Sequence, residues 1–426
     1  MKKRILGTFL SRFLTAILGF ALIIVLSKSL GAEGKGEASL ILATVTVILI
    51  FCDIVGGSAL VYLVPRRNPF QLVCISYIWS IFIAALSGFA LVYLNLIPQQ
   101  YIIHTALITL LGSLGSANLS ILVAKEKIEH YNIIKLLQAL IALLVLAVLI
   151  YGFDFRSVFS FVYCQYIANF SIFIITLFFL PYKEFQVHFR QLDVLVKETF
   201  RLGSFNQLSN LAQLLNYRVS FYILGAFWSA YEVGIYSNGV SIAESIWIFT
   251  NSICMVQYSR IANSTDQDYN RSLTILLSKV TMAVTIPPVI LLYLLPPSFY
   301  QTIFGSEFGE MTVAIKALAP GILLYTISKV ITHFFSGTGQ YHYNLICTLT
   351  GLLVTLVVGF YWIPKDPLSG AGYTASLSYL CSSIMFIYFF VKLEKQSLKV
   401  FLANQGDFTL LKETWKNLKG NKQNNF

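Results

Sequence analysis

Nine ionisable side chains lie inside long apolar stretches of this chain or at their ends. They are Arg12, Lys28, Asp53, Lys135, Arg218, Glu244, Lys279, Lys316 and Lys329. An ionised group in hydrocarbon costs at least ~2.5–3.5 kcal/mol, so it usually faces a cavity or a partner of opposite charge. Arginine is a good bidentate ligand for phosphate. The residue types therefore indicate anion binding at the basic groups and charge balance or proton transfer at the carboxylates.

We predict that Arg12 and Arg218, together with Lys329, bind the anion. We expect the lysines near the ends of the apolar stretches to extend toward lipid headgroups, as their length allows. These lysines are Lys28, Lys135 and Lys279. Asp53 and Glu244 lie deeper, and we predict charge balance or proton coupling for both. The alternative is a salt bridge that fixes helix packing, for example between Asp53 and Arg12, and the two roles are compatible.

Polar residues at helical spacing accompany these charges. Two stripes have a spacing of seven residues, Ser39–Thr46–Asp53 and Ser237–Glu244–Asn251, and a third contains Asn206, Asn210, Gln213 and Tyr217. Each set falls on one face of a helix. Such a face is unsuited to lipid, so it either lines a polar cavity or bonds to a neighbouring helix. We favour a cavity in which the amides and the phenol of the third stripe bind sugar hydroxyls.

The amino-acid composition predicts the class of protein that holds these side chains. Of 426 residues, 57% are apolar and 12% are charged, whereas a soluble domain has about 25% charged residues. The apolar runs are long and continuous, which excludes a membrane barrel. The chain is therefore predicted to be an all-α, polytopic membrane protein. We place twelve spans at about 6–30, 38–63, 72–96, 102–124, 132–151, 157–180, 199–224, 233–256, 273–296, 311–336, 343–363 and 370–391.

The basic residues predict the orientation of these spans. With the N-terminus inside, the inner segments carry 20 Lys and Arg residues and the outer loops carry 3. Because inner loops retain positive charge, both termini are predicted to be cytoplasmic. The net charge of +11 is thus explained by topology and anionic headgroups rather than by nucleic acid. The six cysteines are scattered, and no spacing indicates a metal site or a cofactor.

The segment 181–198 divides the spans into two sets of six. We predict an N-terminal lobe at 1–180, an interfacial helix at 181–198, a C-terminal lobe at 199–391 and a basic cytoplasmic tail at 392–426. Phe185, Phe189, Leu192 and Val196 form the apolar stripe of the interfacial helix, and a similar stripe covers 408–418 of the tail. Six spans followed by six imply a parallel repeat, related by a pseudo-twofold axis along the membrane normal.

Short motifs along nearly the whole chain resemble the polysaccharide (O-antigen type) flippase family of the multidrug/oligosaccharidyl-lipid/polysaccharide exporter superfamily. They are Phe13–Phe20, Leu30–Gly36, Asn216–Arg218, Ile223–Gly225, Val233–Tyr236, Phe304–Phe308, Ala317–Gly321, Gly337–Gln340 and Gly370–Ala375. The resemblance implies two six-helix lobes around a central cavity. It also implies transfer of undecaprenyl-diphosphate-linked oligosaccharide from the inner to the outer leaflet of the bacterial plasma membrane, with no chemical reaction.

In that role, Arg12, Arg218 and Lys329 would attract the diphosphate, while Asp53 and Glu244 would balance charge. Besides membrane lipids, a polysaccharide polymerase and glycosyltransferases are the partners to expect. One alternative is an exporter of drugs or of a peptidoglycan precursor in the same superfamily. A membrane-embedded polysaccharide polymerase or lipid-dependent glycosyltransferase is less favoured, because the longest outer loop, about 297–310, carries only Glu307 and Glu310 as acidic residues.

The predicted topology is tested by cysteine labelling. Single cysteines at Gln99, Asp154 and Asp366 should react with an impermeant reagent added from outside, because all three lie in predicted outer loops. Labelling of these sites only from the cytoplasmic side would contradict the orientation.

Overall fold

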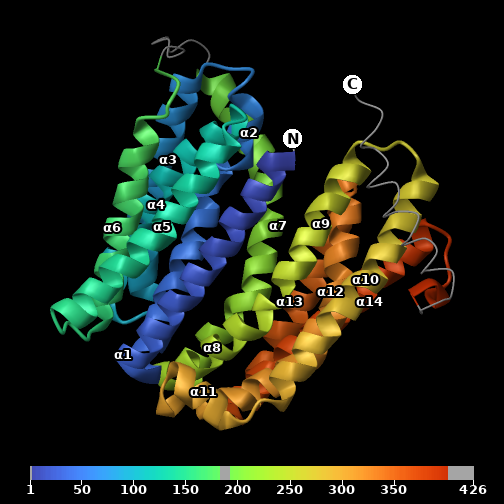
Figure 1. Cartoon of the computed structure of the whole chain (residues 1–426). Coiled ribbons are helices and arrows are strands. Elements are labelled where there is room, and N and C mark those ends of the chain that lie inside the picture. The colour runs from blue at the N-terminus through green and yellow to red at the C-terminus, as the bar shows by residue number, and fades with distance from the viewer. Residues whose placement is uncertain (1, 183–191, 402–426) are drawn as a thin grey trace. The chain divides into compact units, whose positions relative to one another are not determined.

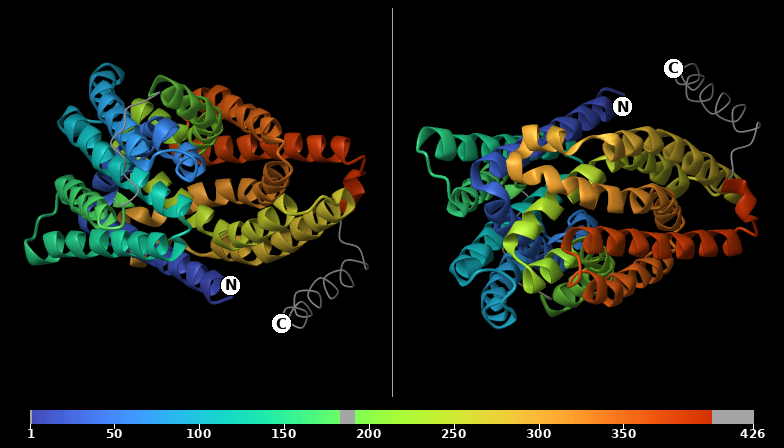
Figure 2. Two further views of the ribbon diagram at one scale, coloured as in Figure 1. Left: turned by 90° about the horizontal axis from the view of Figure 1, so that it is seen from above. Right: turned by 90° about the horizontal axis from the view of Figure 1, so that it is seen from below.

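The computed structural model describes residues 2–182 and 192–401, and these residues form helices and short connections with no strand (Figures 1 and 2). Nine helices in this part are long and apolar enough to cross a membrane, or ten if the bent pair α8–α9 counts as one span. The prediction of a multi-pass, all-α membrane protein is therefore confirmed. The number of twelve crossings stays a prediction, although each of the twelve predicted segments overlaps one or more helices.

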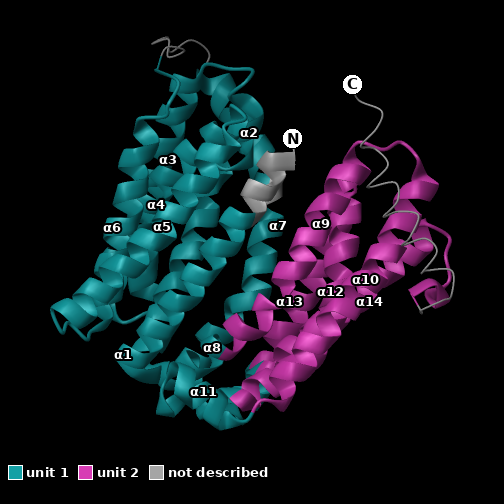
Figure 3. Cartoon of the chain, in the orientation of Figure 1, with its two compact units in different colours: residues 1–238, 296–311, 360–371 teal, residues 239–295, 312–359, 372–426 magenta. Residues whose placement is uncertain are grey.

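The chain forms two compact units, shown in Figure 3. Unit 1 comprises residues 1–238, 296–311 and 360–371, and unit 2 comprises 239–295, 312–359 and 372–426. Helix α8 (Ala230–Ser245) contributes to both. The elements of unit 1 are α1 (Lys2–Gly56), α2 (Ser58–Leu63), α3 (Pro69–Leu94), η1 (Gln99–Tyr101), α4 (Ile102–Ala124), α5 (Ile128–Ala147), η2 (Val148–Gly152), α6 (Val158–Leu177), α7 (Leu192–Phe227), α11 (Pro297–Phe304) and η4 (Ser306–Glu310).

Unit 2 is built from the later helices. They are α9 (Trp247–Ala262), α10 (Gln267–Leu294), α12 (Met311–Gly337), α13 (Tyr341–Trp362), α14 (Pro367–Leu393) and η5 (Leu398–Phe401). Aromatic and aliphatic side chains form its core, among them the fully buried Phe335, Phe386 and Phe390. The residue before α10 caps this helix. The side chain of Asp266 accepts a hydrogen bond from the backbone amide of Tyr269 at 3.0 Å. The acidic pair Asp266 and Asp268 thus belongs to a helix start, and Asp268 pairs with Arg271.

Helix α1 is two helices joined at Gly31. This residue has φ 67° and ψ −172°, which is a conformation that glycine tolerates and other residues rarely adopt. The chain therefore reverses direction there. The two arms of α1 correspond to the two predicted spans 6–30 and 38–63. The second arm begins with unpaired amides, and the carboxylate of Glu307 on η4 accepts the Ala32 amide at 2.6 Å. A carboxylate at this end also complements the helix dipole.

The second arm of α1 crosses α8 with the two backbones in direct contact. A Cβ atom on Gly36 would lie 1.6 Å from the carbonyl oxygen of Ala230, and one on Gly234 would lie 1.8 Å from that of Ala32. Close by, the hydroxyls of Ser39 and Ser237, 198 positions apart, are 2.9 Å from each other. Gly36 and Gly234 have the same separation in sequence. Contacts between equivalent positions are what a twofold-related repeat would produce.

Helix α7 packs against α1 and α2 within unit 1, although we predicted it as the first helix of the C-terminal lobe. A Cβ atom on Gly203 would lie 1.7 Å from the Ile54 carbonyl oxygen, so the two helices touch through their backbones. The predicted lobes stay a prediction, because the grouping by contacts does not test them. The segments 296–311 and 360–371 also lie in unit 1.

The predicted interfacial helix at 181–198 stays a prediction. Residues 183–191 lie outside the described part, and residues 192–198 form the first turns of α7. The tail stripe at 408–418 also lies outside the described residues.

We predict that Gly36→Ala destabilises the protein by about 1–3 kcal/mol or more, because its methyl group would overlap the Ala230 carbonyl. Gly19→Ala is the matched control on the same helix, since nothing lies within 4 Å of its Cβ position. Alanine there should stabilise the helix slightly. Thermal unfolding in detergent compares the two variants, and equal melting temperatures would contradict the close crossing.

Candidate functional site

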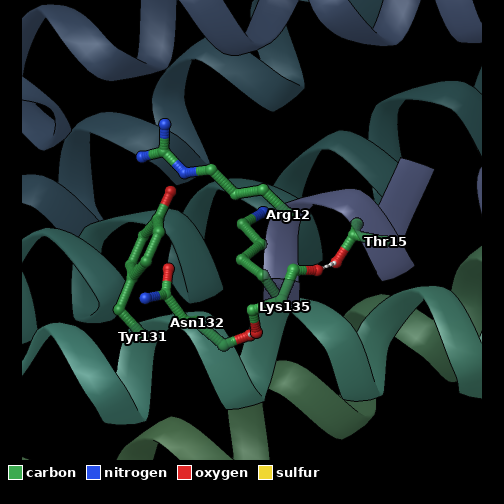
Figure 4. Close-up of a pocket in the computed structure, with 6 residues that line it drawn as sticks. Arg12, Thr15, Tyr131, Asn132 and Lys135 are labelled. Atoms are coloured by element: carbon green, nitrogen blue, oxygen red, sulfur yellow. Dashed lines mark hydrogen bonds between the residues drawn. The ribbon is translucent and has the colours of Figure 1, made fainter. Parts of the chain in front are cut away.

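A polar cavity of about 220 Å³ lies between the first arm of α1 and the start of α5, within unit 1 (Figure 4). It is lined by Ser11, Arg12, Thr15, Tyr131, Asn132 and Lys135. Two of these groups are cations, and the others offer hydroxyl, phenol and amide atoms. No acidic side chain is among the residues that line this cavity. An arrangement of this kind is suited to an anion with several oxygen atoms.

Three residues of each helix line the cavity, and they have the same spacing in both helices. Ser11, Arg12 and Thr15 have the spacing i, i+1, i+4, and residues 131, 132 and 135 repeat it on α5. This spacing keeps three side chains on one face of a helix. The Thr15 hydroxyl donates to the Ser11 carbonyl at 2.8 Å, and the Ser11 hydroxyl lies 3.5 Å from the Asn132 carbonyl oxygen. Figure 4 shows the hydroxyl of Tyr131 pointing toward the guanidinium of Arg12.

Lys135 is held inside unit 1, whereas we predicted that it extends toward the headgroups. Its Nζ atom donates to Oε1 of Gln138 at 3.1 Å, and Gln138 in turn donates to Asn169 on α6 at 2.9 Å. The side chain is half-buried. These two hydrogen bonds fix the ammonium group at the cavity, where it adds a second positive charge to that of Arg12.

Asp53 lies on the second arm of α1, near the end of that helix. Its Oδ1 atom accepts the Ser116 hydroxyl at 3.3 Å, and its backbone carbonyl accepts the Gln207 amide at 3.3 Å. Lys135 is within electrostatic range of this carboxylate. The predicted salt bridge between Asp53 and Arg12 stays a prediction.

The polar stripe of α7 bonds largely within the helix. Asn210 donates to Gln207 at 3.0 Å, and Gln213 donates to the Tyr217 hydroxyl at 3.0 Å. The side chain of Asn206, which we included in the stripe, lies outside the described part of the structure. Gln207 was not predicted, and it connects the stripe to Asp53. A sugar-binding role for the stripe stays a prediction.

Arg218 lies toward the other end of α7. Its guanidinium donates to the Tyr217 carbonyl at 3.3 Å and lies 5.3 Å from the centre of the Phe221 ring. Arg218 and Lys35 are both positively charged and repel each other. The ammonium group of Lys35 is almost fully buried and donates hydrogen bonds to Ser39 and Ser237. A role of Arg218 in anion binding stays a prediction.

Two predicted residues lie in unit 2. The ammonium group of Lys329 is 4.3 Å from the centre of the Trp247 ring and 5.8 Å from that of Tyr325. Glu244 lies within electrostatic range of Lys329. Such a cation–π contact is stabilising by ~2 kcal/mol or more when desolvated. The predicted roles of Lys329 in anion binding and of Glu244 in charge balance stay predictions.

Comparison with known proteins identifies the family. The sequence profile described as "Polysaccharide biosynthesis protein" matches residues 69–313. The chain belongs to this family. A capsular polysaccharide biosynthesis protein of Staphylococcus aureus, CapF, is 24% identical over 254 residues, which are 59% of this chain and 64% of that protein. The match therefore spans less than two thirds of its relative. The predicted relationship to polysaccharide flippases is confirmed.

Solved structures share the fold of this polysaccharide biosynthesis family member. The lipid II flippase MurJ in an inward closed conformation superposes with a TM-score of 0.74 and 15% identity, covering 92% of this chain and 88% of that chain. A multidrug resistance MATE family transporter of the MOP superfamily, in an inward-facing conformation, superposes with a TM-score of 0.73 and 13% identity, covering 89% and 94%. At these identities, the likeness concerns the fold.

Sequence reasoning found one side of the cavity of this family member and missed the other. Arg12 was predicted, but Tyr131 and Asn132 were not, and Lys135 was given a different role. The sequence contains one pattern that could have indicated these residues. Polar residues with the spacing i, i+1, i+4 occur in both helices. That signal identifies a polar face on each helix, while the pairing of the two faces depends on packing.

We predict that Arg12→Gln and Lys135→Gln each weaken the binding of inorganic pyrophosphate about tenfold or more, because a hydrogen bond to a charged group is worth ~1.5–3 kcal/mol. Isothermal titration calorimetry of the purified protein in detergent measures this. Lys365→Gln is the control, since Lys365 lies in a loop over the exposed ring of Tyr361. Unchanged affinity in both cavity variants would exclude the cavity as an anion site.

Proposed function

We propose that this protein is a flippase that moves undecaprenyl-diphosphate-linked oligosaccharide repeat units from the inner to the outer leaflet of the bacterial plasma membrane. The observation that carries the proposal is the cavity with two cations and no lining carboxylate, in a chain of a polysaccharide biosynthesis family. The fold shared with a lipid II flippase and a MATE transporter supports transport as the activity. The protein would form and break no covalent bond.

In the proposed cycle, Arg12 and Lys135 bind the diphosphate on the cytoplasmic side, where both termini are expected to lie. Asn206, Asn210, Gln213 and Tyr217 bind sugar hydroxyls, and the lipid tail stays in the bilayer. Arg218 and Lys329 provide further basic groups along the route, while Asp53 and Glu244 balance their charge. The protein then changes from an inward-open to an outward-open state, which is alternating access.

The membrane potential favours this direction. Outward movement of one negative charge gains ~2.3 kcal/mol per 100 mV, so a bare diphosphate with two charges gains about 4–5 kcal/mol. Protons or sodium ions are further candidates for coupling through Asp53 and Glu244. Released repeat units would pass to a polysaccharide polymerase for assembly of a surface polysaccharide such as O-antigen.

The second candidate is export of another substrate. The shared fold with a multidrug transporter favours a drug, and the shared fold with a lipid II flippase favours a peptidoglycan precursor. Two cations at the cavity disfavour a cationic drug. A peptidoglycan precursor offers the same diphosphate group, and the family match favours polysaccharide precursors over it.

The function is tested in proteoliposomes that contain a labelled undecaprenyl-diphosphate oligosaccharide. The protein should expose the sugar to an impermeant reagent on the opposite side of the membrane, and Arg218→Ala should slow this more than Lys279→Ala at equal protein levels. Protein-free liposomes give the background rate. Absence of transfer above that rate, with transfer of lipid II or export of a dye instead, would contradict the proposed substrate.

A further inference from the structure

We infer that Gln138 and Asn169 are positioning residues of the proposed anion site. Their neutral amides hold the ammonium group of Lys135 at the cavity, so they fix its position and add no negative charge. The inference rests on the proposed function, because it assigns a role to two residues that support the cavity without lining it. It concerns how strongly the site attracts an anion rather than which lipid is transported.

Two hydrogen bonds form a relay that joins α5 to α6 within unit 1. The ammonium group of Lys135, which lines the cavity (Figure 4), donates to Oε1 of Gln138 at 3.1 Å. Nε2 of Gln138 donates to Oδ1 of Asn169 at 2.9 Å. Gln138 lies three positions after Lys135, where side chains of one helix are neighbours. Asn169 is 8% exposed, so the far end of the relay is anchored inside the unit.

The charge of Lys135 dictates the orientation of both amides. An ammonium group has three donors and no acceptor, so it bonds to the oxygen of the Gln138 amide. The NH₂ group of that amide then points away from the lysine and needs an acceptor, which Oδ1 of Asn169 supplies. Hydrogen bonds in which the donor is ionised are about twice as strong as neutral ones. Reversal of either amide would therefore break the relay at its strongest bond or directly behind it.

Helix α4 also contributes to the position of Asn169. Helix α6 packs against both α4 and α5. A Cβ atom on Gly112 of α4 would lie 3.8 Å from Cγ and from Oδ1 of Asn169. The glycine thus leaves space for the amide, and α4 passes close beside it. The asparagine is therefore placed by packing against one helix and by a hydrogen bond to another.

A neutral acceptor at position 138 has a consequence for the charge of the site. Without a partner, a lysine in an apolar helix extends toward the headgroups, because its long side chain allows this. A carboxylate would also hold the ammonium group, but it would cancel the positive charge. Asp53 already lies within electrostatic range of Lys135, and a second carboxylate would weaken the attraction for an anion further. An amide holds the lysine and leaves this balance unchanged.

The test is calorimetric binding of inorganic pyrophosphate to the purified full-length protein in detergent. Asn169→Leu should weaken binding about two- to tenfold, because an ammonium group that is not held in advance must be ordered on binding. In a Lys135→Gln background the same substitution should have no effect. Thr176→Val is the matched control on α6, since it removes the acceptor of a buried hydrogen bond from Asn118 of α4. It should bind like the wild type.

Two substitutions of Gln138 separate positioning from stability. Gln138→Met removes the acceptor and should show the same loss of about two- to tenfold. Gln138→Glu keeps an acceptor for Lys135, so it should unfold at no lower temperature than Gln138→Met. It should nevertheless bind pyrophosphate about tenfold or more weakly than the wild type, because it adds a negative charge beside the site. A purely structural role predicts the opposite order, in which the less stable variant binds less.

That opposite order would overturn the inference, as would a loss in Asn169→Leu that persists in the Lys135→Gln background. Gln138→Met breaks the same relay from a half-buried position and serves if Asn169→Leu does not fold. If the wild type binds pyrophosphate and the relay variants bind it equally well, only this inference fails. If the wild type binds none, the proposed anion site fails with it. Normal binding and relay effects without transfer of the lipid-linked sugar would contradict the proposed function alone.

Discussion

A charge inside an apolar helical bundle must be compensated, and this requirement organises unit 1. Lys135 donates to Gln138, Gln138 donates to Asn169 of α6, and the carboxylate of Asp53 accepts the Ser116 hydroxyl of α4. Side-chain hydrogen bonds thus join α5 to α6 and α1 to α4. A buried charge without such partners would cost several kcal/mol. These hydrogen bonds allow a charged side chain such as Lys135 to lie at the cavity of an apolar chain.

Close backbone contact is the second condition for this arrangement. Gly36 and Gly234 allow α1 to touch α8, and Gly203 allows α7 to touch α1. Small residues at such crossings are typical of membrane helices, which associate by packing rather than by exclusion from water. The crossings fix the second arm of α1, and the carboxylate of Glu307 caps its first amide.

The proposed function combines these features with the family. A polysaccharide biosynthesis family member with a MOP-type fold has a cavity that is positive where a lipid-linked diphosphate would bind.

The sequence by itself determined the all-α membrane architecture and the family, because hydropathy and motifs are local properties. It also contained the matching polar faces of α1 and α5. Only the tertiary structure decided that these faces form one cavity, that Lys135 lies inside it rather than at the headgroups, and that α7 packs with unit 1. The physical reason is that helix pairing depends on contacts between residues far apart in sequence, such as Gly203 with Ile54 and Gln138 with Asn169. A periodic pattern shows which face of a helix is polar, but it carries no information on the helix that this face meets.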